Sequence, residues 1–270
     1  GKRAFAHVRT ITQRFGSRGS ATKAEAATAV YVQQCLAASG VADIRLQSFI
    51  GLCSMWLFLS LVFGLAVTGH MALFLLRVPL PIWTAWTVAA LFFCAASLLL
   101  WRKPFRRGGW LCRYLPCGAS QNVIAVIPPS GEVRRRVILI AHQDSSRSLI
   151  WFASNALIAI YELGARIALY GLVAAPFCYA MALLTPWKGF VWLGILMGLV
   201  HFIAWFSGMT ADLGPYSPGA NDGASGMGVL LALAEDLQRT PLLETEIWLL
   251  FSGCSQTDGA GMLHFLADYE

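Results

Sequence analysis

The chain has 270 residues and a formal net charge of +6, with 20 Lys and Arg against 14 Asp and Glu. Hydrophobic residues make up 57% of it, charged residues only 13%, and its mean hydropathy is +0.61. Because soluble domains carry about 25% charged residues, this composition excludes an ordinary soluble protein and predicts membrane-spanning segments.

The first polar segment, residues 1–49, has the pattern of the start of an α/β domain. Residues 22–38 show the periodicity of a helix that ends at Gly40, and residues 41–49 alternate like a strand. The beginning, Gly1-Lys-Arg-Ala-Phe-Ala-His, is basic and lacks an apolar core. We therefore expect no cleavable signal peptide there.

Two pairs of apolar runs interrupt the polar sequence. The first pair covers residues 50–78 and 82–101, and the second covers residues 167–184 and 189–209. Each run has the length that a membrane span needs, about 20 apolar residues. We predict two transmembrane hairpins, at 50–101 and within 150–209.

Residues 150–163, ahead of the second pair, are apolar but include Asn155 and Glu162. This pattern predicts an interfacial lead-in helix, with a fifth span as the alternative.

Two hairpins return the chain to the same side of the membrane each time. The polar segments 1–49, 102–149 and 210–270 can therefore assemble into one domain. Further patterns in them predict strands and helices, at residues 121–127, 135–141, 229–237, 246–251 and 263–269. The predicted fold class is α/β, a mixed sheet flanked by helices, with two inserted transmembrane hairpins.

Basic residues gather on the polar side of the hairpins, whereas the hairpin tips carry only Arg77 and Lys188. The flanking residues are Arg102, Lys103, Arg106, Arg107, Arg113, Arg147 and Arg166. The positive-inside rule then predicts a cytoplasmic domain, and contact with anionic lipid headgroups is compatible with it. We expect no nucleic-acid partner, because no binding motif accompanies these residues.

The seven cysteines indicate little about the chemistry of the protein, since most lie in apolar runs or are isolated in the sequence. Cys112 and Cys117 are the only close pair in the polar segments. Their spacing is not that of a zinc ribbon, so we expect no structural metal there.

Two motifs have the residue types of a metal site. Residues 137–141 predict a buried strand with His142 and Asp144 at its carboxyl end, where α/β folds place their chemistry. Alternate strand residues share a face, so His142 can ligate a metal while Asp144 orients a ligand. Later, Pro218-Gly-Ala-Asn-Asp-Gly-Ala-Ser-Gly226 forms a Gly-rich turn that places Asp222 at a helix entrance. Asp222 can be the N-cap of that helix instead of a ligand, or both.

In order, the polar motifs resemble those of the co-catalytic di-zinc exopeptidases, the group of bacterial leucyl aminopeptidases and glutamate carboxypeptidase. The matching stretches are Arg18-Gly-Ser-Ala-Thr, Ser120-Gln-Asn-Val-Ile-Ala-Val-Ile, Ala141-His-Gln-Asp-Ser, the 218–226 turn and Leu250-Phe-Ser-Gly-Cys. The hairpins fall outside the resemblance and look like insertions of a membrane-embedded branch. The resemblance implies a zinc-exopeptidase-like sheet, two zinc ions and a peptide substrate. The chain would be an amino-terminal fragment, with the remaining ligands beyond Glu270.

By this resemblance, His142 would ligate one zinc ion, Asp222 would bridge the two ions, and Asp144 would orient the site. The family has a Glu-Glu pair in which the first Glu is the general base and the second ligates zinc. Here Ser255 stands at the base position and Gln256 at the ligand position.

This substitution matters chemically. Serine at its ordinary pKa does not accept a proton from metal-bound water, and an amide oxygen is a poor zinc ligand. Asp258 would replace them only after a rearrangement of the loop, and we expect a solvated side chain.

Two functions follow. The first is a membrane-anchored zinc exopeptidase that hydrolyses peptide bonds through metal-activated water. The second is a catalytically impaired relative that acts as a binding or regulatory module in the bilayer. A transporter is a weaker third interpretation. Apart from the isolated Glu162, nothing in the apolar segments resembles the broken helices or the intramembrane charge pair of a transporter.

The other histidines divide by their surroundings. His7 and His264 lie on helical patterns and are expected to be structural. His70 and His201 lie in apolar spans, where an ionisable group is either functional or a helix contact.

Overall fold

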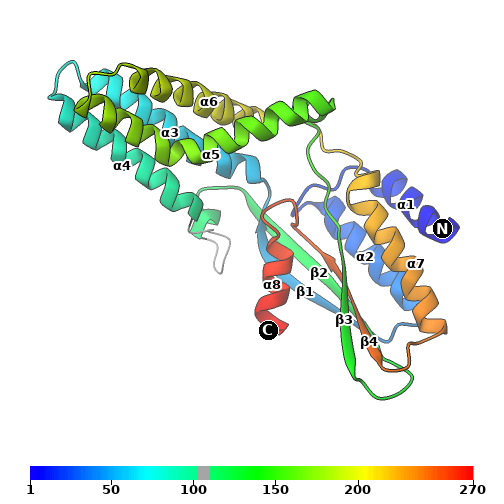
Figure 1. Cartoon of the computed structure of the whole chain (residues 1–270). Coiled ribbons are helices and arrows are strands. Elements are labelled where there is room, and N and C mark those ends of the chain that lie inside the picture. Colours follow the sequence, from blue (N-terminus) through cyan, green and yellow to red (C-terminus); the bar gives the residue numbers. More distant parts are fainter. Residues whose placement is uncertain (102–109, 270) are drawn as a thin grey trace. The chain divides into compact units, whose positions relative to one another are not determined.

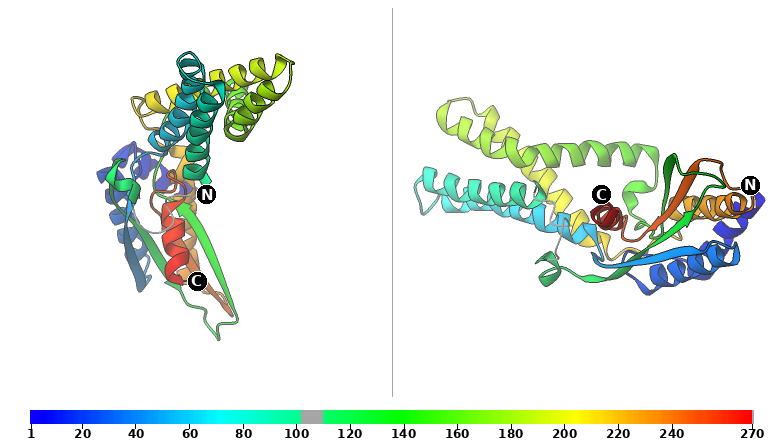
Figure 2. Two further views of the ribbon diagram at one scale, coloured as in Figure 1. Left: turned by 90° about the vertical axis from the view of Figure 1, so that its left-hand side faces the viewer. Right: turned by 90° about the horizontal axis from the view of Figure 1, so that it is seen from below.

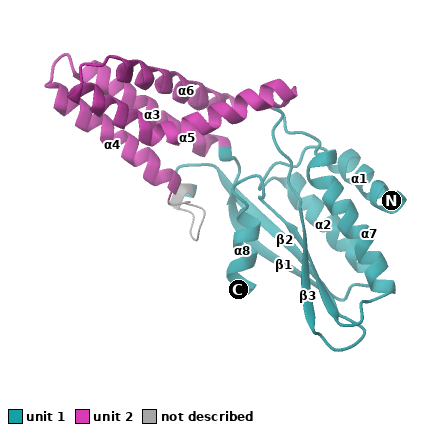
Figure 3. Ribbon diagram, in the orientation of Figure 1, with its two compact units in different colours: residues 1–55, 108–148, 215–270 teal, residues 56–107, 149–214 magenta. Residues whose placement is uncertain are grey.

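The computed structural model describes residues 1–101 and 110–269 (Figure 1). They form two compact units, and each unit is built from segments that are distant in sequence (Figure 3). Unit 1 comprises residues 1–55, 108–148 and 215–270, and unit 2 comprises residues 56–107 and 149–214. Four basic residues used to predict the membrane orientation lie outside the described residues: Arg102, Lys103, Arg106 and Arg107.

Unit 1 contains a four-stranded sheet of order β1-β2-β4-β3. The strands are β1 (Asp43–Leu52), β2 (Cys117–Ile127), β3 (Arg135–His142) and β4 (Thr245–Ser252). β2 is antiparallel to both β1 and β4, whereas β3 and β4 are parallel. The predicted fold class, an α/β unit with a mixed sheet, is confirmed.

Helices cover both faces of this sheet (Figures 1 and 2). On one face lie α1 (Lys2–Phe15), α2 (Lys23–Ala38) and α7 (Ser225–Arg239), and on the other lies α8 (Ala260–Tyr269). Alternate side chains of β2 divide between the faces, as the period of a strand requires. Val123, Ala125 and Ile127 belong to the main core with the three helices, and Ile124 packs with Phe265 of α8.

Strand β3 lies at the edge of the sheet, which corrects the prediction of a buried strand. Val137, Ile138 and Ile140 are 40%, 42% and 47% exposed. The apolar run indicates burial on both faces, but within the described residues the third and fourth positions of the sheet are β4 and β3, with no strand beyond β3.

Unit 2 consists mainly of four helices that are each long and apolar enough to cross a membrane. They are α3 (Met55–Leu76), α4 (Ile82–Trp101), α5 (Asn155–Leu184) and α6 (Gly189–Ala211). The predicted interfacial helix is not a separate element. After a short 3₁₀ turn, η2 (Ile150–Phe152), it is the beginning of the 30-residue helix α5.

The start of the first hairpin also differs from the prediction. Strand β1 continues through Leu52, so that α3 begins at Met55 rather than near Ile50. Apolar residues of the strand and of the span form one continuous run in the sequence, and hydropathy alone does not divide them.

Three polar rings form a buried hydrogen-bonded chain in unit 2. Tyr179 Oη lies 2.8 Å from His70 Nδ1, and His70 Nε2 lies 3.0 Å from His201 Nδ1. His201 Nε2 lies 2.9 Å from the carbonyl oxygen of Ala168. Because that carbonyl only accepts, neutral rings must donate in one direction, from Tyr179 to His70, to His201 and to Ala168. The two histidines therefore serve as helix contacts among α3, α5 and α6.

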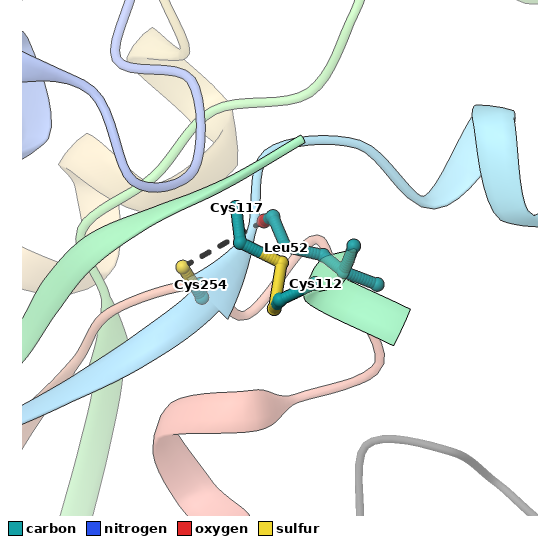
Figure 4. The surroundings of a disulfide bond; sticks show 4 residues. All are labelled: Leu52, Cys112, Cys117 and Cys254. Carbon is teal, nitrogen blue, oxygen red and sulfur yellow. Dashed lines mark hydrogen bonds between the residues drawn. A yellow bond between two sulfur atoms is a disulfide. The ribbon is translucent and has the colours of Figure 1, made fainter. Parts of the chain in front are cut away.

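Cys112 and Cys117 are bonded to each other in a disulfide (Figure 4). Their Cα atoms are 5.4 Å apart, and the bond ties the 3₁₀ turn η1 (Trp110–Arg113) to the first residue of β2. Cys117 pairs in register with Leu52 of β1, whose carbonyl oxygen lies 4.0 Å from the buried thiol of Cys254.

Candidate functional site

The candidate site lies in unit 1, beyond the carboxyl ends of the parallel strands β3 and β4. His142 is the last residue of β3, and Gln256 lies in the loop that follows β4. Asp222 belongs to the turn η3 (Ala220–Ala224), which precedes α7. The sheet topology thus brings together motifs that are up to 114 positions apart (256 − 142).

The imidazole of His142 has a partner at each ring nitrogen. Nδ1 lies 2.9 Å from the carbonyl oxygen of Asp144 and 3.3 Å from its Oδ1. Nε2 lies 3.2 Å from Oδ1 of Asp222. Donation from Nδ1 fixes the ring and turns Nε2 toward Asp222, the orientation that a metal-binding histidine also requires.

Asp144 is fully buried and contacts the groups that carry the site. Besides contacting His142, its carboxylate accepts a hydrogen bond from Ser20 Oγ at 2.7 Å and one from the backbone N–H of Gln256 at 2.8 Å. One side chain therefore positions both His142 and the loop after β4.

Asp222 receives protein donors on both carboxylate oxygens. Gln256 Nε2 lies 3.3 Å from Oδ1 and 3.1 Å from Oδ2, and the backbone N–H of Ser146 lies 3.3 Å from Oδ2. The alternative role of Asp222 as the N-cap of the following helix is not found: Ala224 occupies that position, and no side chain caps it.

The turn that carries Asp222 needs a glycine at position 223. Gly223 has φ of +89°, and a Cβ there would lie 2.9 Å from the carbonyl oxygen of Asp144 and 3.1 Å from that of His142. Only glycine allows the turn to approach the end of β3 so closely. This contact sets the distance between Asp222 and His142.

The pairing of His142 with two carboxylates changes the proton affinity of the ring. Its hydrogen bonds to Asp144 and then Asp222 raise the pKa of His142 to about 10, and the hydrogen bond to His142 lowers the pKa of Asp222 to about 2. With no metal ion bound, the site at neutral pH is therefore an imidazolium facing a carboxylate. A zinc ion would have to displace that proton, because only the neutral ring is a ligand.

We expect the His142 ring to remain doubly protonated at pH 8, which ¹⁵N NMR of histidine-labelled protein can measure. The folded-state pKa is raised, so the stabilisation is complete below pH 6.5 and disappears as the pH rises through about 10. The stabilisation from Asp222 is present above pH 3.8 and disappears as the pH falls through about 2. A His142→Asn variant assigns the signal, and a neutral ring at pH 8 would contradict the ion pair.

Ser255 and Asp258 are not joined to His142 or Asp222 by a hydrogen bond or ion pair in the described part of the chain. Ser255 Oγ lies 2.7 Å from Ser252 Oγ. Asp258 has φ of +61°, and within the described residues it forms no hydrogen bond or ion pair with His142 or Asp222.

Sequence reasoning gave no role to Arg18, which is completely buried beside the site. Its guanidinium donates to the carbonyl oxygens of Gly16, Gln143, Pro218 and Gly219 at 2.8 to 3.2 Å. It thereby ties together the loops that carry the two motifs. Burial lowers the pKa of Arg18, and the charges of the two site aspartates oppose this effect.

The sequence analysis also gave no role to Glu25, although the residues around it have a recognisable pattern. Thr22 and Glu25 have the spacing of a capping box, and Thr22 Oγ1 accepts from the N–H of Glu25. The buried carboxylate also accepts from the N–H groups of Ala21 and Cys254 and from Ser120 Oγ, at 2.8, 2.8 and 2.9 Å. Burial raises its pKa to about 7. Glu25 thus links the start of α2 to the loop that carries Gln256.

The described side chains do not by themselves complete a zinc centre. Catalytic zinc has three protein ligands and structural zinc has four. Among the described residues, no group of three or more His, Cys, Asp or Glu side chains is placed to hold a metal ion. His142 and Asp222 meet, but the third neighbour, Gln256, turns an N–H donor toward Asp222.

No protein-family model and no curated protein matches the chain. Among solved structures, it is similar to a glutaminyl cyclase of Fimbriiglobus ruber, with a TM-score of 0.43 and 12% identity over 93% of this chain and 44% of that one. It is also similar to a zinc aminopeptidase of Bacillus subtilis, with a TM-score of 0.43 and 13% identity over 94% of this chain and 61% of that one. The chain spans less than two thirds of either structure.

Proposed function

We propose that this chain is a membrane-anchored relative of the zinc exopeptidases whose soluble unit binds a peptide ligand without hydrolysing it. The observation that carries the proposal is the hydrogen bonding of Asp222. The resemblance implies that this carboxylate bridges two zinc ions, but here both of its oxygens accept from protein N–H groups, and Nε2 of His142 lies 3.2 Å from Oδ1.

The electrostatic balance of the site supports the same proposal. The His142 ring and the Gln256 amide both contact the Asp222 carboxylate, so that its charge has two protein partners. The position of the family's general base holds Ser255, whose hydroxyl is bonded to Ser252. A hydroxyl with such a partner has neither the charge nor the pKa to take a proton from water.

A zinc exopeptidase is the second candidate, and one distance favours it. His142 Nε2 and Asp222 Oδ1 are 3.2 Å apart. Two ligands about 2.0–2.1 Å from one tetrahedral zinc ion are separated by roughly 3.3 Å. The two side chains would hold one ion if the His142 proton were lost and the other ligands were supplied.

The deciding experiment compares the full-length protein in detergent with a Ser255→Glu, Gln256→Glu double variant. We expect the parent to show little zinc and no aminopeptidase turnover. The double variant regains an anionic ligand, and because even outer-shell changes shift metal affinity by about 10- to 100-fold, zinc binding should tighten by at least that factor.

Two further variants make this comparison specific. Gln13→Glu adds a carboxylate on the exposed face of α1 and should leave zinc binding unchanged. Adding His142→Ala to the double variant should abolish the gain. Two zinc ions and turnover in the parent would establish the exopeptidase instead.

Membrane anchoring rests on the four long apolar helices. We place unit 1 on the cytoplasmic side because Arg113 and Arg147 flank the hairpins, whereas Arg166, which the sequence places beside the second hairpin, lies within α5. The Cys112–Cys117 disulfide favours the opposite side, since disulfides persist in oxidising compartments. Labelling of these thiols in intact cells with a membrane-impermeant maleimide, before and after reduction, separates the two orientations.

A further inference from the structure

Unit 2 contains an apolar cleft of about 450 Å³ between η2, α3, α5 and α6. Its lining follows the helical period. On α6 the lining residues are Val200, Ile203, Ala204 and Ser207, which are spaced as one stripe along a helix face. In a closed bundle such a stripe would be covered by the neighbouring helices.

A matching stripe lines the cleft from α5. Ile160, Leu163, Gly164 and Ile167 repeat the same spacing. A Cβ added at Gly164 would meet nothing within 4 Å, so there is open space above this residue. Ligand pockets have volumes of about 300–1,000 Å³. The cleft therefore has the size of a ligand site.

The cleft opens on the outer, apolar surface of the helices. Leu163 is 61% exposed, Ile160 is 58% exposed and Ile203 is 45% exposed. Within the described residues its lining includes no Asp, Glu, Lys, Arg or His. In a bilayer the cleft would be continuous with the lipid-facing surface of the spans, and hydrocarbon would be the medium at its mouth.

Aromatic rings with polar atoms gather along one part of the lining. The ring centroids of Trp56 and Tyr161 are 6.4 Å apart, and those of Trp151 and Tyr161 are 6.5 Å apart. Trp56 is the second residue of α3, and Trp151 lies in η2, just before α5. These are span ends, and Trp and Tyr favour the headgroup level of a membrane.

We propose that the cleft binds one acyl chain of a membrane phospholipid, with the ester end of the chain near Trp56, Trp151 and Tyr161. The apolar lining and the open side fit the chain, and the aromatic cluster fits the polar end of the lipid. The site lies wholly in unit 2. It does not depend on the function proposed for unit 1.

The test uses the full-length protein in phosphatidylcholine vesicles that contain a trace of phosphatidylcholine with a photoreactive acyl chain. After irradiation, mass spectrometry maps the adducts. We expect them to concentrate on cleft residues such as Leu163 and Ile203. Gly164→Phe places a ring in the open space and should lower these adducts about tenfold, equivalent to about 1.4 kcal/mol.

The matched control is Ala95→Phe, which adds the same ring at an exposed position of α4 outside the cleft. It should leave the adducts unchanged. If Gly164→Phe does not fold, Ala204→Phe fills the cleft from α6 instead. Adducts spread evenly over all lipid-facing positions, or an equal loss in the control, would overturn the proposal. Competition by a sterol and not by phosphatidylcholine would also overturn it.

Discussion

Replacing Arg18 by methionine is expected to destabilise unit 1 by about 3–5 kcal/mol, a large part of the roughly 5–15 kcal/mol that holds a domain folded. Methionine fills similar space, but it leaves the carbonyl oxygens of Gly16, Gln143, Pro218 and Gly219 without this donor. Each buried group that loses its partner costs about 1–3 kcal/mol.

The measurement uses a thiol that belongs to the same unit. Cys254 is completely buried, so its alkylation in increasing urea reports the unfolding of unit 1. Arg134→Met is the control, because Arg134 is 67% exposed in its ion pair with Glu244. Exposed pairs contribute about 0–1 kcal/mol. Equal urea midpoints for the two variants would refute the role of Arg18.

Asp144→Asn is expected to loosen the site and to destabilise unit 1 by about 2–4 kcal/mol, because hydrogen bonds to charged groups contribute about 1.5–3 kcal/mol each. The carboxylate accepts from Ser20, from the N–H of Gln256 and from His142. An amide offers one oxygen and turns an N–H₂ group toward the remaining donors. The pKa of His142 should also fall, because its hydrogen bond to Asp144 is the largest cause of its rise.

Hydrogen exchange separates this local effect from general unfolding. Amides in residues 253–259 should exchange faster in Asp144→Asn, while those of β2 remain protected. Asp43→Asn, which removes the charge of an exposed partner of Arg45, should change neither. Unchanged exchange around Gln256 would mean that Asp144 does not hold this loop.

Much of the fold can be predicted from the sequence, because its helices and strands follow the local periodicity of apolar residues. The ends predicted for β2 and β4 lie within four residues of their observed ends, and the predicted end of β2 at Ile127 coincides with the observed one. Periodicity does not show which strands lie next to each other in the sheet. The apolar run of β3 looks like a buried strand, yet its position at the edge of the sheet depends on how distant segments assemble.

The site shows the same division. His142, Asp144 and Asp222 are recognisable because their residue types and order match a known chemistry. Arg18 bonds to backbone carbonyls, which no sequence pattern marks. The donation from Gln256 to Asp222 likewise depends on the path of the loop after β4. The substitution of the Glu-Glu pair is visible in the sequence, but the arrangement that replaces it is visible only in three dimensions.

The chain of polar rings in unit 2 also limits how α6 can lie against α3 and α5. A Cβ at Gly194 of α6 would overlap the ring of Tyr179, and one at Gly198 would lie 3.2 Å from His70 Nδ1. Moving α6 by one residue shifts it 1.5 Å and turns it by about 100°, which would bring a larger side chain against each ring and separate His201 from His70. Single hydrogen bonds between membrane helices contribute only about 0.6 kcal/mol on average. The rings therefore favour one alignment of α6 against α3 and α5, and they do so through their shape more than through the strength of their hydrogen bonds.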